Sequence, residues 1–258
     1  MPATRSPLRR GPARIGLALA VLALTSCGDT RAHTSSHGPE LAPTAARGPA
    51  PASGIVATVG RTRITGAVYD HWLAIGEATV KPYSAKGPLP NPVIYDPPAF
   101  GDCVARLSGA TIGERRRRCE RRYNAIQTRV LDFLIVGYWL REAAARHHLR
   151  VSSAELRREY GAEVRKHYAT VGALARFEKA SRQTRADLEF ALETQMLSSR
   201  LIGAFAKKHP HEPSERAAIQ AFNSGIKQEW VPRTTCARGY VVTDCKQYEP
   251  PTDPRSSR

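Results

Sequence analysis

Apolar residues recur at spacings of three and four along most of the chain from residue 66 to residue 230, and this pattern predicts helices. The longest helix is expected to begin after Thr111, where Thr-Ile-Gly-Glu has the form of a capping box, and to run to about residue 147. Its centre, FLIVGYWL, is apolar on all sides, which is typical of a helix buried among others.

Further helices are predicted before and after this one. The sequence Ser152-Ser-Ala-Glu155 repeats the capping pattern, and Thr184 precedes another amphipathic run. The expected helices begin after Thr65, run from Ser152 to about Tyr168, cover 171–180, run from Thr184 to just before His209, and run from Glu212-Pro213-Ser214 to about Trp230. Only residues 209–214 separate the last two, so no domain fits between them, because a domain needs about 50 residues or more.

Short strands are predicted at the two ends of the helical region. Residues 55–59, IVATV, alternate and are β-branched, and Gly60 follows as a turn residue. The run GYVV, 239–242, is the expected partner, because a lone strand leaves its backbone groups unpaired. The predicted fold is therefore mainly α: a bundle of about six helices with a small two- or three-stranded sheet, formed by the N-terminal strand and a C-terminal hairpin.

We place the folded region at residues 53–248. Segments of unusual composition lie before it, within it and after it. Residues 28–52 are small and polar with almost no large apolar side chain, so they are predicted to be a disordered tether. Six prolines between residues 82 and 98 exclude a helix interior or a central strand and indicate a long surface loop. Residues 249–258 are expected to form a disordered tail.

The N-terminus has the organisation of a signal peptide. Residues 1–14 carry four arginines and no acid, and the apolar run 15–25 would cover about 16 Å as a helix, too short for a bilayer core of about 30 Å. The ending Leu-Thr-Ser-Cys27 resembles a bacterial lipobox, in which Cys27 would carry the lipid. The alternative is an ordinary signal peptide with an incidental cysteine. We therefore expect an extracytoplasmic protein anchored to the outer face of the bacterial cell membrane.

The other four cysteines, in an exported protein, predict disulfides. Three pairings are possible, and the nearest-neighbour pairing of Cys103 with Cys119 and Cys236 with Cys245 closes the shortest loops. The second pair would lock a terminal hairpin. A zinc site is disfavoured, because the pairs are not CxxC and no histidine stands at ligand spacing beside them. No metal or other cofactor is expected.

The chain is strongly basic, with a formal net charge of +16 that falls to about +12 once the four arginines of residues 1–27 are removed. Such a surplus favours an anionic partner: a membrane surface, a cell-wall polymer or acidic client chains. Because the protein is expected to be exported, nucleic acid is not an expected partner. The run Arg115, Arg116, Arg117 and Arg118 has two interpretations, a solvated helix face or a contact with anionic lipid or polymer.

Motifs of enzymatic chemistry are not found: the sequence contains no GxSxG, HExxH, GxxxxGK[ST] or GxGxxG behind a strand. We therefore assign no catalytic residues.

The stretch IVATVGRTRITGAVYDHWL, 55–73, resembles the start of SurA/PrsA-type extracytoplasmic foldases, and the paired cysteines and C-terminal IKQEWVPRTTCARGYVVTDC resemble an actinobacterial lipoprotein branch of that group. The matching positions are Val56, Ala57, Val59, Gly60, Ile64, Thr65, Tyr69, Asp70 and Trp72. The resemblance implies a helical chaperone domain that binds unfolded or nascent secreted polypeptides. Many members carry a parvulin-type prolyl isomerase before the last helix, where this chain has only residues 209–214.

Three functions follow as hypotheses. The leading one is a lipid-anchored holdase that binds unfolded secreted proteins without a catalytic step. The alternatives are a foldase related to peptidyl-prolyl cis-trans isomerases and a structural or interaction lipoprotein of the cell envelope.

Overall fold

The structure, a computed structural model, describes residues 54–78, 93–109, 111–210 and 214–250. The predicted signal peptide with Cys27, the tether, residues 82–92 of the proline-rich loop and residues 251–258 of the tail lie outside the described residues. Residues 93–98 of that loop contain neither helix nor strand.

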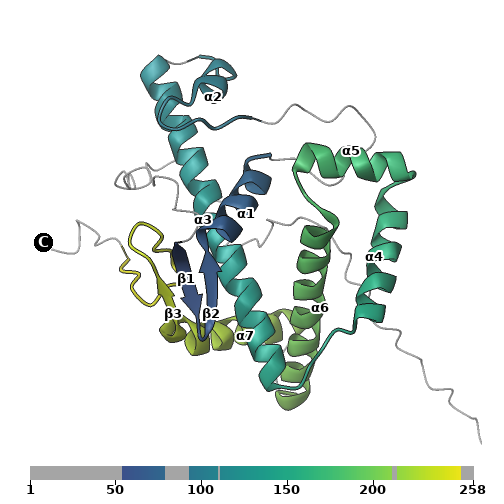
Figure 1. Ribbon diagram of the computed structural model, residues 1–258. Coiled ribbons are helices and arrows are strands. Elements are labelled where there is room, and N and C mark those ends of the chain that lie inside the picture. Colours follow the sequence, from purple (N-terminus) through teal and green to yellow (C-terminus); the bar gives the residue numbers. More distant parts are fainter. Residues whose placement is uncertain (1–53, 79–92, 110, 211–213, 251–258) are drawn as a thin grey trace, which may run out of the picture.

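The described chain is mainly helical with one small sheet, which confirms the predicted fold class (Figure 1). The helices are α1 (Gly66–Ala78), α2 (Gly101–Ala105), α3 (Ile112–Arg146), α4 (Ser153–His167), α5 (Val171–Ser181), α6 (Arg185–Lys208) and α7 (Glu215–Trp230), followed by a 3₁₀ turn, Val231–Arg233. The strands are β1 (Ile55–Val59), β2 (Thr62–Thr65) and β3 (Thr234–Cys236). The short helix α2 was not predicted.

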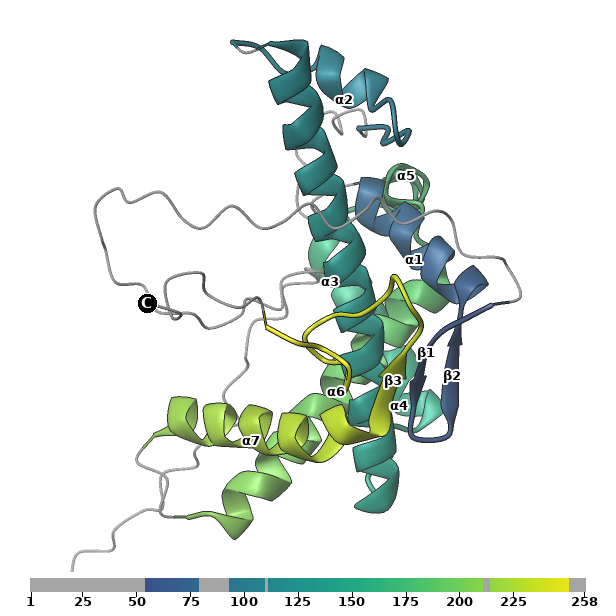
Figure 2. The same ribbon diagram turned by 90° about the vertical axis from the view of Figure 1, so that its left-hand side faces the viewer.

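Helix α3 is the axis of the fold, since it runs the length of the molecule and contacts α1, α2, α6 and β1 (Figures 1 and 2). Most of its apolar centre is buried, and Leu131, Leu134, Ile135 and Trp139 are fully enclosed, whereas Val136 and Tyr138 are half-buried. The Phe190 ring of α6 packs closely on Gly137, where an added Cβ would lie 3.3 Å from Phe190 Cζ. Helix α7 packs across α6, with the rings of Phe205 and Phe222 6.0 Å apart (Figure 2).

The sequence sets the helix starts locally. Thr111 and Ser152 each form the predicted capping box, with Glu114 and Glu155 respectively. Thr184 forms a third with Asp187 at the start of α6. Each box satisfies backbone N–H groups that the first turn of a helix leaves unpaired.

The sheet has the antiparallel order β2-β1-β3, with Ala57 opposite Cys236 and Val59 opposite Thr234. The C-terminal partner of β1 is therefore Thr234–Cys236, and the expectation that GYVV would pair as part of a hairpin is wrong. GYVV forms an irregular loop in which Gly239 has a φ of +84°. Two of its side chains, Tyr240 and Val242, are instead buried in the main hydrophobic core.

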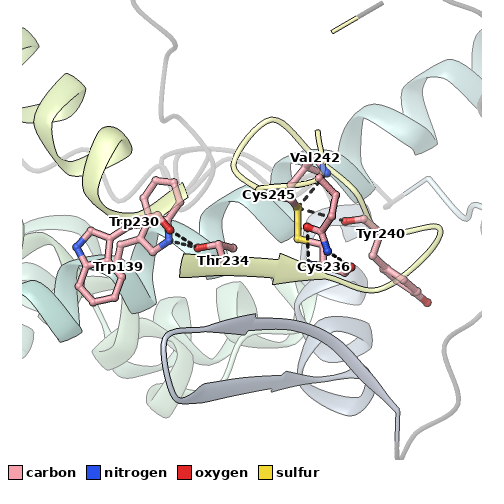
Figure 3. Close-up of a disulfide and its surroundings, with 8 residues drawn as sticks. Trp139, Trp230, Thr234, Cys236, Tyr240, Val242 and Cys245 are labelled. Atoms are coloured by element: carbon pink, nitrogen blue, oxygen red, sulfur yellow. Dashed lines mark hydrogen bonds between the residues drawn. A yellow bond between two sulfur atoms is a disulfide. The ribbon is translucent and has the colours of Figure 1, made fainter. Parts of the chain in front are cut away.

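Both disulfides have the nearest-neighbour pairing. Cys103–Cys119 fixes α2 on the N-terminal part of α3, and all four sulfur-bearing side chains are buried in the main core. Cys236–Cys245 closes the C-terminal loop onto β3, where the Val242 N–H donates to Cys245 Sγ at 3.2 Å (Figure 3). The last turns that the structure describes are thereby held against the sheet.

Candidate functional site

The candidate site is a surface. Among the described residues no group of three or more His, Cys, Asp or Glu side chains is arranged to hold a metal ion. None of the helices described is long and apolar enough to cross a bilayer. What distinguishes the molecule is a pair of helices that stands partly apart from the main core.

Helices α4 and α5, which we call the arm, connect α3 to α6; α4 runs beside α6, and α5 crosses towards α1 (Figure 1). The Ser152 capping box starts α4, and the Thr170 side chain accepts a 3.1 Å hydrogen bond from the Ala173 N–H at the start of α5. Arg182, in the left-handed region with a φ of 58°, ends α5 and turns the chain into α6.

The inner side of α4 is apolar but incompletely covered. Leu156, Tyr160 and Val164 recur every four residues and so lie on one face of the helix. We call these three residues the apolar stripe. All three are only half-buried, and α4 contains no fully buried residue. A helix in a compact core normally buries such a stripe completely. Helix α4 therefore covers part of α6, while its own apolar side chains remain partly exposed to solvent.

The end of the arm has a small core of its own. Tyr168, Phe177 and Leu188 form a cluster separate from the main one, and the rings of Tyr168 and Phe177 lie 5.3 Å apart. Ala173 and Leu174 pack at its edge. A cluster of three buried residues stabilises far less than the main core, so the arm is the part of the fold expected to open at the lowest free-energy cost.

Packing between α4 and α6 also leaves a gap. A cavity of about 10 Å³ is lined by Tyr160, Glu163, Val164, Tyr168, Leu188 and Leu192. This volume is at the lower limit for a water molecule, and most of the lining side chains are apolar or aromatic. The surrounding side chains forfeit dispersion contacts across it, which weakens the docking of α4 on α6.

Polar contacts tie the arm to α6 at one end and at the middle of the stripe. Arg200 of α6 donates to Glu155 of α4 and to the Arg150 carbonyl. The Arg185 guanidinium lies 4.9 Å from the centre of the ring of Tyr160, the middle residue of the stripe. The hydrogen bond from Arg200 holds the pKa of Glu155 below its ordinary range. These contacts are near the surface, where ion pairs are individually weak.

Two further polar pairs join α1 to the end of α5 and to the start of α6. His71 Nε2 lies 2.7 Å from Oδ1 of Asp187, whose other oxygen accepts from Thr184 in the capping box. At the end of α5, Arg182 lies 3.9 Å from Glu77. Burial raises the pKa of Glu77, and the nearby Arg182 opposes that rise. Both pairs join residues far apart in the sequence, and no sequence pattern indicates them.

A second, polar cleft of about 430 Å³ lies where the β1–β2 turn meets α3 and α7. The Trp230 ring forms its wall, with the guanidinium groups of Arg146 and Arg233 at 4.4 and 5.6 Å from the ring centre. Both arginines also pair with Glu229. Through Glu229 these two arginines hold the end of α3 against α7.

The four arginines 115–118 do not form one surface. Arg115 is half-buried, and its Nη1 donates a 2.8 Å hydrogen bond to the Leu107 carbonyl beside α2. Arg116, Arg117 and Arg118 are exposed. At about 100° per residue, Arg117 lies roughly 160° and Arg118 about 100° around the helix from Cys119, whereas Arg116 lies only about 60° from it.

No protein-family description, curated protein or solved structure matches this chain. The likeness to extracytoplasmic foldases therefore rests on the sequence features given above.

Proposed function

We propose that this protein is a lipid-anchored extracytoplasmic holdase, which binds apolar segments of unfolded or nascent secreted polypeptides between α4 and α6 and performs no bond chemistry. The observation that carries the proposal is the half-buried apolar stripe Leu156, Tyr160 and Val164 on a helix without a buried residue. In the free protein α6 partly covers these three side chains. They become fully accessible to a client when the arm moves away from α6.

Client binding would exchange one apolar contact for another. When α4 moves, the stripe and the facing Leu188 and Leu192 of α6 become available to a client segment. Burying a Leu- or Phe-sized client side chain stabilises the complex by about 1.5–3 kcal/mol. Undocking α4 and ordering the client cost part of that gain. The result is weak, reversible binding that needs no energy source for release.

The surface of the arm adds a charge preference. Arg157, Arg158, Arg165 and Arg176 are all exposed on α4 and α5. They would attract acidic client chains to the arm, and salt would screen the attraction. The holdase would therefore favour apolar segments flanked by acidic residues.

The cysteines support the proposed compartment. Both disulfides join buried residues of the main core, and such bonds persist in oxidising surroundings outside the cytosol. Lipidation at Cys27 rests on the lipobox-like sequence alone.

The test is aggregation of a reduced, unfolded secretory protein in the presence of the full chain. We expect suppression at a stoichiometric ratio, and a clear loss of suppression when Leu156 and Val164 are replaced by serine. Ile94→Ser is the matched control, since Ile94 is a 55% exposed apolar residue away from the arm, and it should leave suppression unchanged. Wild-type protein that fails to suppress aggregation would refute the proposal.

The serine variants could lose suppression simply because they fold poorly. A second measurement on the wild-type protein therefore accompanies the aggregation assay. Hydrogen exchange of the wild-type protein with and without client should show changes on α4 and the facing side of α6. A client footprint confined to other elements would contradict the assignment of the surface. A proline-limited refolding assay separates the holdase from an isomerase-related foldase, and we expect no acceleration.

A further inference from the structure

The two ends of the arm are attached to the rest of the fold in different ways. One end is the junction, residues 181–187, where α5 ends beside α1 and α6 begins (Figure 1). The other end is the loop 147–152, which leads from α3 into α4 at the end of the arm away from α5 (Figure 1). The strengths of these two attachments decide which end of the arm opens and how a client reaches the apolar stripe.

The junction is buried and internally bonded. Its three buried residues, Ser181, Gln183 and Asp187, are all polar. The Gln183 N–H donates a 3.1 Å hydrogen bond to the Glu178 carbonyl, and Asp187 completes the capping box at the start of α6. The small core of the arm adjoins the junction, because its member Leu188 directly follows Asp187. Displacing the junction would break these bonds and uncover part of that core, so the junction resists movement.

Helix α1 holds the junction from outside the arm. His71 Nε2 lies 2.7 Å from Asp187 Oδ1, and the Glu77 carboxylate lies 3.9 Å from the Arg182 guanidinium. Helix α1 is itself fixed, because its apolar side chains, among them Trp72, are buried in the main core. The two pairs therefore attach the junction to an element that does not belong to the arm and does not move with it.

The loop end is attached less firmly. None of the loop residues and none of the residues of α4, all of which the structure describes, is fully buried apart from the arm core. Leu149 and Val151 are half-buried at the edge of the main core. Arg200 donates to the Arg150 carbonyl and to Glu155, and the side chains of Arg200 and Glu155 are 31% and 27% exposed. An ion pair that water reaches to this extent is weak, so the loop end detaches more easily than the junction.

We propose that the arm is a lid that opens from its loop end: α4 leaves α6 while α1 keeps the junction in place, and the contacts of Arg200 determine how often this happens. This inference rests on the holdase function proposed above and describes how its binding surface is regulated. Leu156 is the stripe residue farthest from the junction, so it becomes accessible first. A client competes with the closed state, so its apparent dissociation constant rises as the open fraction falls.

The test is hydrogen exchange of the full chain, in which Cys27→Ser removes the predicted lipidation site. Rates of hydrogen-bonded amides, corrected for intrinsic exchange, are compared for α4, the junction and α3. In this parent chain we expect α4 to exchange faster than the junction, because the lid opens without it.

Arg200→Gln should raise the exchange rate of α4 about fivefold and that of the junction less than about twofold. Arg216→Gln is the matched control, since Arg216 is an exposed arginine of α7 outside the arm. The same loss of charge there should change neither rate by more than about twofold. His71→Ala combined with Glu77→Gln should show the opposite pattern, with about fivefold faster exchange at the junction and a smaller effect on the start of α4. Unchanged exchange of α3 shows that each variant is folded.

Two exchange results would overturn the proposal. One is an equal response of α4 and the junction to each variant, which would mean that the arm moves as one body. The other is an unchanged rate of α4 in Arg200→Gln, which would mean that this residue does not keep the lid closed.

Binding of the reduced, unfolded secretory protein, measured by fluorescence anisotropy, separates this inference from the holdase function. Arg200→Gln should lower the apparent dissociation constant about fivefold, in proportion to the open fraction. Equal binding by the parent and by a variant whose lid opens faster would overturn the regulatory role. A lid that opens as expected in a protein that binds no client supports the opening mechanism and refutes the holdase.

Discussion

Trp139 Nε1 donates a 2.8 Å hydrogen bond to Thr234 Oγ1, and this contact joins the middle of α3 to the last strand of the sheet (Figure 3). The Thr234 hydroxyl donates in turn to the Trp230 carbonyl at 2.9 Å. Trp139 and Thr234 are both fully buried, so neither partner has water as a substitute. One hydroxyl group therefore connects α3, the end of α7 and β3.

Thr234→Val should lower the free energy of unfolding by about 2 kcal/mol, because it leaves a buried indole N–H and a buried carbonyl unpaired at almost constant volume. Denaturant titration monitored by tryptophan fluorescence measures the change. Thr235→Val is the matched control, since Thr235 is exposed on the same strand, and it should shift stability by less than about 0.5 kcal/mol. Equal effects of the two substitutions would show that the buried bond contributes nothing.

Replacing Cys236 and Cys245 together by alanine should destabilise the domain by about 2.5–3 kcal/mol, since the bond closes a loop with a sequence separation of 9. The same double replacement at Cys103 and Cys119, with a separation of 16, should cost about 3 kcal/mol. Thermal unfolding in the presence and absence of reductant checks both. A variant that keeps its full stability, or a wild type insensitive to reductant, would contradict this account.

Acid should loosen the arm. The pKa of Glu155 is lowered in the folded protein by its bond from Arg200, so its contribution is complete above the ordinary carboxyl pKa and disappears as pH falls through the lowered value. Hydrogen exchange of α4, corrected for intrinsic rates, should become faster between pH 6 and about pH 3 relative to α3.

Glu155→Gln isolates the ion pair in that experiment, because glutamine can still complete the capping box with Ser152. In this variant α4 should exchange faster at neutral pH, and the pH dependence of the arm should shrink. An unchanged pH profile would assign the acid effect to other carboxylates.

Gly137→Leu should separate α3 from α6 and destabilise the fold by about 1–3 kcal/mol, because even a Cβ at this position meets Phe190 at 3.3 Å. Gly203→Leu is the control on α6, where an added Cβ meets nothing within 4 Å. That substitution should stabilise α6 slightly through helix propensity. Calorimetric melting temperatures compare the two, and a stable Gly137→Leu protein would show that the interface can repack.

Local signals in the sequence were sufficient for most of the helices. The capping boxes at Thr111 and Ser152 and the amphipathic run after Thr184 locate helix starts that the structure confirms. Such features depend on residues three or four positions apart, so they can be predicted from the sequence without knowledge of the tertiary structure. The nearest-neighbour disulfide pairing is confirmed for the same reason, because each bond joins nearby segments.

Features set by tertiary packing were not predictable. GYVV has the composition of a strand, yet its side chains are buried from a loop, while the three-residue strand Thr234–Cys236 is too short to show alternation. The candidate surface shows the same limit. Leu156, Tyr160 and Val164 have the spacing of an ordinary core stripe, and only the position of α6 leaves them half-buried.

The position of β1 between β2 and β3 has a consequence for biogenesis. Because synthesis starts at the N-terminus, one edge of β1 remains without its native neighbour until residues 234–236 emerge, after all the helices that the structure describes. The sheet therefore stays incomplete while the helices are being made, and pairing of the closing strand is the step that completes it.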